Sequence, residues 1–138
     1  MPRDPMADVT VKRTEDFETY YLGAMAKVRS GLGVSSFGMQ LIQMAPNEER
    51  YPEHDHSHDG QEEVYVTLEG SATLTAGGEE HGLEPGVWAR VGPAEKRKIV
   101  SGDDGVRILA LGGVPGKVFD PGEATEEGQP DPMAASAE

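Results

Sequence analysis

Residues 51–70 read YPEHDHSHDGQEEVYVTLEG, and they hold three of the four histidines in the chain. Side chains alternate between the two faces of an extended strand, so His54, His56 and His58 would share one face. The Asp-Gly pair at 59–60 follows directly and suits a two-residue turn that needs positive φ. This stretch therefore predicts a β-hairpin that carries its histidines on one side.

The expected hairpin pairs position 58 with 61, 56 with 63 and 54 with 65. This register brings Gln61, Glu63 and Tyr65 to the face of the histidines, whereas Glu62 points away. Two or three imidazoles then lie opposite a carboxylate, which suits Fe(II), Mn(II), Ni(II) or Zn(II) and leaves positions open for a substrate. A solvated surface turn is the alternative, but such a turn does not require this spacing. We therefore predict a divalent metal site.

The rest of the chain shows a β pattern. Apolar runs of four to nine residues recur at short intervals, with Gly, Pro and Asp between them, and helical periodicity is nearly absent. Turns are expected at 77–78, 84–86 and 101–105, where Gly-Gly, EPG and SGDDG stand. The pattern predicts an all-β sandwich or barrel. Its expected strands are 37–45, a stretch through 54–58, 62–69, 71–76, 79–83, 87–91, 97–101 and 106–112.

Length and charge restrict the function further. The 138 residues are enough for one domain, and 25 acidic against 12 basic residues give a net charge of -13. An acidic surface repels phosphate backbones and anionic lipids, so we expect no nucleic-acid and no membrane partner. The chain has no cysteine, which excludes disulfides and thiolate metal sites. Its first 16 residues lack an apolar run of signal-peptide length, and we expect a cytoplasmic protein.

The ends of the chain differ in composition from its centre. We expect a flexible segment at 1–14, a barrel domain at 15–118 and a disordered acidic tail at 119–138, because both ends have few large apolar residues. Residues 15–28 fit neither periodicity and are expected to form an edge strand, a short helix or an arm that contacts a second copy. Pairing a sheet edge with a second copy protects it, so a homodimer is expected.

One motif in the histidine segment resembles a known family. His56-x-His58, four residues, Glu63, six residues and Gly70 match the first motif of the cupin superfamily, except that Arg50 stands where the motif has its leading glycine. The resemblance implies a single jelly-roll-like cupin β-barrel with flexible tails. It also implies a metal site for a small-molecule ligand within the barrel.

The second cupin motif is degenerate. Gly86 agrees with its first position, but Arg97 and Ser101 stand where the motif has histidine and asparagine. The 15 residues between Gly70 and Gly86 are about the length of the linker in small microbial cupins. The resemblance implies that the missing histidine would be the fourth metal ligand. Arginine cannot take this role, since guanidinium stays protonated.

Arg97 therefore has two functional interpretations. Either a metal ion is held by the histidines and Glu63 while Arg97 binds a substrate carboxylate, or Arg97 pairs with Glu63 and the barrel is free of metal. A third interpretation places Arg97 on the outer surface beside the lysines at 96 and 98.

Spacing leaves the choice of histidines open. His54 with His56, or His56 with His58, would bind the metal together with Glu63. Glu63 acts as a ligand or, if it swings off the metal, as a catalytic base.

Two further residues are candidate substrate contacts. Gln61 contacts either a metal ligand or the substrate, and Tyr65 either contacts the substrate or fills the barrel. Small cupins include dioxygenases, isomerases, decarboxylases and epimerases, so the resemblance implies a metal-dependent enzyme without selecting its reaction. A non-catalytic barrel that binds or senses a small molecule is the alternative, and the loss of the fourth ligand at Arg97 favours it.

Overall fold

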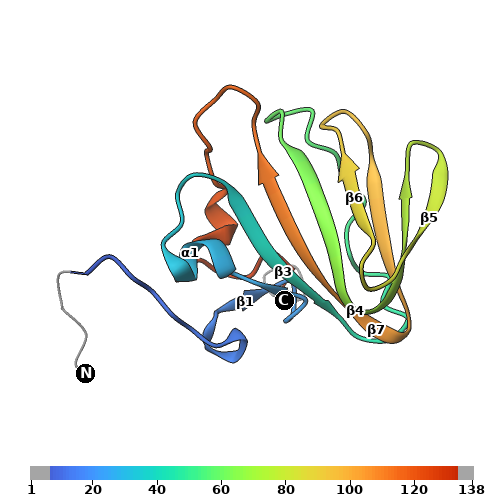
Figure 1. The fold of residues 1–138 in the computed structure, drawn as a ribbon, viewed down its shortest axis with the longest axis horizontal. Coiled ribbons are helices and arrows are strands. Elements are labelled where there is room, and N and C mark those ends of the chain that lie inside the picture. Colours follow the sequence, from blue (N-terminus) through green and yellow to red (C-terminus); the bar gives the residue numbers. More distant parts are fainter. Residues whose placement is uncertain (1–6, 134–138) are drawn as a thin grey trace.

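A computed structural model describes residues 7–133 of the chain, and antiparallel β-strands dominate it (Figure 1). Within that range, seven strands form one hydrogen-bonded sheet in the order β1-β2-β3-β7-β4-β5, with β6 paired to β4. The all-β fold class that the sequence predicts is confirmed. The strands are β1 (Thr19–Tyr20), β2 (Met25–Ala26), β3 (Gly38–Met44), β4 (Glu62–Ala76), β5 (Glu79–Leu83), β6 (Trp88–Val91) and β7 (Arg97–Gly113).

Helical structure is short throughout the described part. Its named elements are the 3-10 turn η1 (Thr14–Asp16), the single-turn helix α1 (Val28–Leu32) and the 3-10 turn η2 (Glu123–Thr125). None of these helices is long and apolar enough to cross a membrane. The open question about 15–28 is answered in part, because this stretch contains the two short edge strands β1 and β2 and leads into α1. A contact of this stretch with a second copy stays a prediction.

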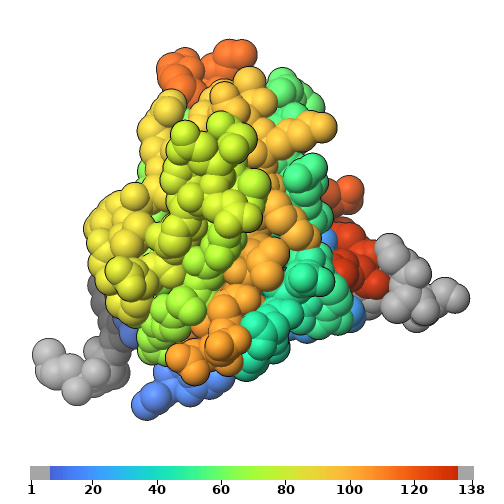
Figure 2. Space-filling view, turned by 90° about the vertical axis from the view of Figure 1, so that its right-hand side faces the viewer, coloured from blue at the N-terminus to red at the C-terminus, as the bar shows by residue number. Residues whose placement is uncertain are grey.

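Two long bent strands, β4 and β7, organise the barrel. The first part of β4 pairs with β6 and the end of β7, whereas its second part pairs with β5 and the start of β7. Register shifts between these parts bend the strand at Gly70. A Cβ at Gly70 would lie 2.1 Å from the Gly105 carbonyl oxygen, and φ is 74° there, so only glycine fits. Figure 2 views the molecule from the side on which β5 and the second part of β4 lie.

The bends correct two details of the sequence interpretation. The expected strands 62–69 and 71–76 are one strand, β4, and 97–101 and 106–112 are likewise one strand, β7. The SGDDG stretch at 101–105 lies within β7 and makes no hairpin turn. Glycines in these stretches permit a bulged bend that keeps the ladder going, which their composition alone does not distinguish from a turn.

The inner face of the barrel is packed at its centre and open at one end. Tyr65, Ile42 and Ile108 are fully buried in the core. At the next inward position of β4, Glu63 pairs with Gly112, which in turn pairs with Gly38. These two glycines bring no side chains, and Phe119 and Gln61, which line the cavity, lie against them instead.

Part of the expected C-terminal tail is fixed against the start of the chain. Lys27 Nζ donates to the carbonyls of Glu126 (2.8 Å) and Gln129 (3.1 Å). The Asp131 carboxylate accepts the backbone N–H groups of Tyr21 and the residue after it. Residues 119–133 thus differ from the disordered tail expected at 119–138. Their contacts are polar and distant in sequence, so an apolar pattern does not reveal them. Residues 1–6 and 134–138 lie outside the described part, and the domain limits at 15 and 118 stay predictions.

Candidate metal centre

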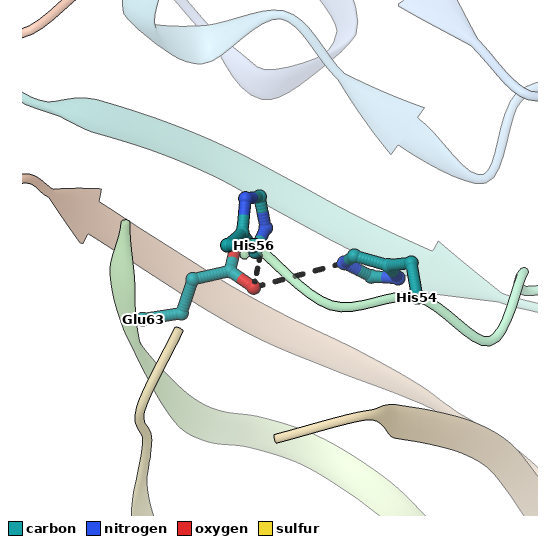
Figure 3. A group of neighbouring side chains, drawn as sticks. All are labelled: His54, His56 and Glu63. Carbon is teal, nitrogen blue, oxygen red and sulfur yellow. Dashed lines mark ion pairs between the residues drawn. The ribbon is translucent and has the colours of Figure 1, made fainter. Parts of the chain in front are cut away.

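Three of the predicted ligands meet at the open end of the barrel. His54, His56 and Glu63 each offer one ligand atom, and these atoms lie within 4.8 Å of one another. His56 Nε2 is 3.2 Å and His54 Nε2 is 3.8 Å from Glu63 Oε1. Figure 3 shows both imidazoles turned toward this one oxygen. The structure thus brings together the first of the two histidine pairs considered from the sequence.

The loop that carries the histidines is held by main-chain hydrogen bonds to residues 93–97. His54 forms an isolated antiparallel bridge with Arg97. The His54 N–H donates to the Arg97 carbonyl at 3.1 Å, and the Arg97 N–H donates to the His54 carbonyl at 2.8 Å. The His56 N–H donates to the Pro93 carbonyl at 2.8 Å. Because two main-chain anchors hold this short extended stretch, the side chains at 54 and 56 still point the same way.

The predicted hairpin is wrong. Residues 54–58 do not pair with 61–65, since Glu63 pairs with Val91 and Gly112 instead. The chain turns back on itself at 56–60, where the Gly60 N–H donates to the His56 carbonyl at 2.7 Å. The turn closes on the histidine segment alone, so no ladder can continue from it.

The tautomer of each imidazole is set by its second nitrogen. His54 Nδ1 lies 2.9 Å from the Pro52 carbonyl oxygen, and His56 Nδ1 lies 3.1 Å from Asp59 Oδ1. A carbonyl and an ionised carboxylate only accept hydrogen bonds, so both Nδ1 atoms carry the proton. A neutral ring would then turn its Nε2 lone pair toward Glu63, where a metal ion could bind, whereas a doubly protonated ring would donate from Nε2 to the Glu63 carboxylate.

Glu63 remains ionised in this setting. Its Oε1 accepts hydrogen bonds from the Tyr65 hydroxyl (2.7 Å) and from Arg97 Nη1 (2.6 Å). Burial alone would raise the pKa of the Glu63 carboxyl, but hydrogen bonds with His54, His56 and Tyr65 outweigh it and lower the pKa well below its usual value. The Glu63 carboxylate in turn raises the pKa of His56, although burial of the ring opposes this.

Arg97 lies inside the barrel, with 0% of its side chain exposed. Besides Glu63, it donates from Nε to the Glu95 carbonyl and from Nη2 to the Gly92 and Glu95 carbonyls. The structure thus shows the Arg97–Glu63 pair that the sequence offered as one interpretation, and it excludes a place on the outer surface. A direct contact with substrate would require Arg97 to leave these partners.

A cavity of about 370 Å³ opens beside the three ligands. Gln61 lies on its wall, and its amide donates to Asp59 Oδ2 at 2.9 Å. Tyr65 is fully buried and touches the site through Glu63, so it fills the barrel as well as holding the carboxylate. Apart from the polar residues near the ligands, much of the wall is aromatic or apolar. Its members include Tyr20, Met25, Tyr51, Ala110 and Phe119.

His58 does not join the other two histidines at Glu63. Its side chain is 74% exposed, and its Nε2 lies 3.4 Å from Asp59 Oδ2 at the rim of the cavity. Sequence reasoning missed Asp59 as a member of the site. The available signal was its position three residues after His56, at a turn that returns its carboxylate to the ring.

Other residues of the cavity also escaped the sequence interpretation. Arg29 and Phe119 lie on its wall, although one belongs to α1 and the other to the C-terminal segment. Tyr51 is buried, and its hydroxyl interacts with that of Tyr65. No local pattern marks residues that reach the site from separate parts of the chain.

Comparison with known proteins identifies the fold. No family model matches the chain, and no curated protein matches it. Among solved structures, a cupin protein from Bacteroides fragilis superposes with a TM-score of 0.59 at 22% identity, over 75% of this chain and 86% of that one. The chain has a cupin fold. The chain also resembles a sugar phosphate isomerase of the cupin superfamily from Silicibacter pomeroyi, with a TM-score of 0.58 at 23% identity over 75% of this chain and 68% of that one.

A third similar structure has a different role. It is the cupin domain of an XRE family transcriptional regulator from Enterobacter cloacae, with a TM-score of 0.52 at 20% identity over 60% of this chain and 86% of that one. In this chain, Arg97 stands where the sequence resemblance to the second cupin motif would have a histidine. Its place beside Glu63 agrees with that alignment, and it leaves three ligands for any metal ion.

Proposed function

We propose that this cupin binds one divalent metal ion through Nε2 of His54, Nε2 of His56 and the carboxylate of Glu63, and acts on a small organic molecule in the cavity. The observation that carries the proposal is the approach of both Nε2 atoms to one Glu63 oxygen, at 3.8 and 3.2 Å, while each Nδ1 lies against another acceptor. Two imidazoles and a carboxylate suit Fe, Mn, Ni or Zn. When bound, the ion supplies a Lewis acid that polarises a substrate oxygen.

The residues around the ligands set the charge of the centre. Arg97 compensates the negative charge of Glu63, and both histidines are neutral as ligands. A divalent ion in this site would keep nearly its full charge, which favours substrates with an anionic or strongly polar oxygen. Glu63 is a weak base because its pKa is lowered, so its role here is that of a ligand rather than a general base.

The cavity determines the size and polarity of the substrate. Its volume of about 370 Å³ and its aromatic wall suit a small organic molecule with an apolar part. Gln61 presents its amide near the ligands and is the proposed polar contact. An isomerase or dioxygenase reaction is proposed, and the sugar phosphate isomerase among the similar structures supports the first of these.

A second candidate function is non-catalytic binding or sensing of a small molecule without a metal ion. The Arg97–Glu63 pair at 2.6 Å favours it, because the carboxylate already has a permanent cation. In that case a proton on His56 Nε2 would donate to Glu63. The cupin domain of the transcriptional regulator is consistent with such a role.

A homodimer in the cytoplasm completes the proposal. Trp88 on β6 is 69% exposed, and Leu68 on β4 is exposed as well. Large apolar side chains at the surface suit a contact with a second copy. The charge of -13 supports the absence of nucleic-acid and membrane partners.

A comparison of metal binding by the wild type and by His56→Ala tests the first function. The wild-type cupin is expected to bind about one equivalent of zinc or manganese and to melt at a higher temperature in its presence, since a ligand that binds only the folded state stabilises it. His56→Ala should lose both effects. His81→Ala is the matched control, because His81 lies exposed on β5, away from the site. Equal metal content in wild type and His56→Ala would contradict the proposed ligand set and favour the metal-free function.

A further inference from the structure

A second group of ligand atoms lies on the outer side of His56. His56, His58 and Asp59 each offer one atom within 4.8 Å of the others. Asp59 Oδ2 is the centre of this group, at 3.2 Å from His56 Nδ1 and 3.4 Å from His58 Nε2. The rings of His56 and His58 are stacked, with centroids 5.8 Å apart and planes at 24°.

These distances are those of a coordination shell. Ligand atoms that surround a tetrahedral ion at metal bond lengths of zinc sites lie roughly 3.4 Å from one another. The two measured distances to Asp59 Oδ2 match this separation. The backbone N–H and side-chain amide of Gln61 donate to the same carboxylate and hold it in place.

The two groups share one imidazole through its opposite nitrogens. His56 Nε2 faces Glu63 and the inner group, whereas Nδ1 faces Asp59 and the outer group. An ion on one nitrogen leaves the proton on the other, because a neutral imidazole carries a single N–H. Ordinary imidazole chemistry therefore allows His56 to serve only one of the two groups at a time.

We propose that His56, His58 and Asp59 form an outer divalent-cation site at the rim of the cavity. The outer and inner sites cannot be occupied at the same time, and the outer site delivers its ion to the inner one. The delivery step rests on the proposed function, since it requires an inner metal site, whereas the outer site itself does not. The His58 side chain is 74% exposed, against 31% for His54 and 15% for Glu63, so the outer group has the more accessible ligand.

Transfer inward would break the bonds of the ion to His56 Nδ1, His58 and Asp59 and form bonds to His56 Nε2, His54 and Glu63. On the outer site the ion has displaced the Nδ1 proton, and Nε2 carries the proton that it donates to Glu63. When the ion moves to Nε2, that proton leaves Nε2 and Nδ1 takes up a proton from water, so the count of protons is unchanged. Asp59 then accepts the Nδ1 proton and holds the ring as an inner ligand.

Nitrogen-15 NMR of histidine-labelled protein tests the site directly, because it reports which ring nitrogen of each histidine binds zinc. In the wild type with one equivalent of zinc, His56 should bind through Nε2. In His54→Ala, which removes an inner ligand, His56 should bind through Nδ1 and His58 through Nε2. His54→Gln provides a second variant if the alanine variant fails to fold. The double variant His54→Ala/His58→Ala should lose at least tenfold in zinc affinity relative to His54→Ala.

Rates give an independent measurement. In an otherwise wild-type protein, His58→Ala should slow zinc uptake several-fold and leave the equilibrium zinc affinity unchanged. The control His81→Ala should change neither the rate nor the affinity. The outer site is overturned if His54→Ala binds zinc through Nε2 of His56, or binds none. A wild type that binds zinc only through Nδ1 would support the outer site and refute the inner one. Zinc on neither nitrogen would refute both.

Discussion

Two buried cations hold two different parts of this cupin. Arg97, in β7, and Lys27, before α1, are 0% and 1% exposed, and each donates to main-chain carbonyls. Arg97 also contacts the buried Glu63 carboxylate at 2.6 Å, whereas the carboxylate nearest to Lys27 is that of Glu18, half exposed at 3.5 Å. The difference shows that one cation balances a charge inside the barrel, while the other fastens a segment of chain.

Each cation therefore controls a different property of the cavity. Arg97 determines the charge on the candidate ligand Glu63. Lys27 holds the carbonyls of Glu126 and Gln129, and the segment before them supplies Phe119 to the cavity wall. Arg29 adds an ion pair with Glu126. The first cation belongs to the β framework, and the second secures a wall that no strand pairing holds.

The largest expected effect comes from removing the charge inside the barrel. Arg97→Met should lower the free energy of unfolding by about 3–5 kcal/mol, because it leaves the buried Glu63 carboxylate without its cation. Urea unfolding followed by circular dichroism measures this loss. The double variant Arg97→Met/Glu63→Gln should recover part of it. Equal stability of the two variants would show that the pair contributes little.

The second cation should give a smaller and local effect. Lys27→Met removes the buried donor of two hydrogen bonds to the Glu126 and Gln129 carbonyls and should cost about 1–3 kcal/mol. Hydrogen exchange should quicken at Gly128, whose N–H is held by Glu18, and leave β4 and β7 unchanged. Lys12→Met is the control, since Lys12 makes a partly exposed ion pair with Glu127 at 3.8 Å and a cation–π contact with Phe17 at 5.9 Å, and its side chain is not buried. Faster exchange throughout β4 would contradict a local role for Lys27.

The fold could be predicted because its information is local. Alternating apolar residues in the second part of β4 and the glycines at 77–78 define the hairpin with β5, and the structure has it. The bend at Gly70 could not be told from a turn, since both need a residue with positive φ. The anchoring of 119–133 was hidden for another reason, because Lys27 reaches carbonyls about 100 residues away, and carbonyls belong to every residue type.

The site was predicted in part. The i, i+2 spacing of His54 and His56 survives in the structure because the loop stays extended there. The partner of that loop is the chain at Arg97, which the sequence could not indicate, since the local turn favoured a hairpin with Glu63. The burial of Arg97 was ambiguous because Ile99 and its neighbour Val100 are both apolar and leave the inward parity of the strand open.

The smallest expected effect is a dependence of stability on pH that arises at His56 and Glu63. In metal-free protein, the raised pKa of His56 stabilises the fold below the usual imidazole value of 6.5, and this contribution is lost as the pH rises through the raised value. The lowered pKa of Glu63 acts oppositely: its contribution is present above the usual carboxyl value of 4.5 and is lost as the pH falls toward the lowered one.

Melting temperatures in chelator should therefore fall from pH 6 to 9, and His56→Gln should flatten the curve. Zinc should reverse the slope, because a proton on Nε2 competes with the ion. An unchanged slope in His56→Gln would assign the dependence to other groups and remove the support for a proton shared between His56 and Glu63.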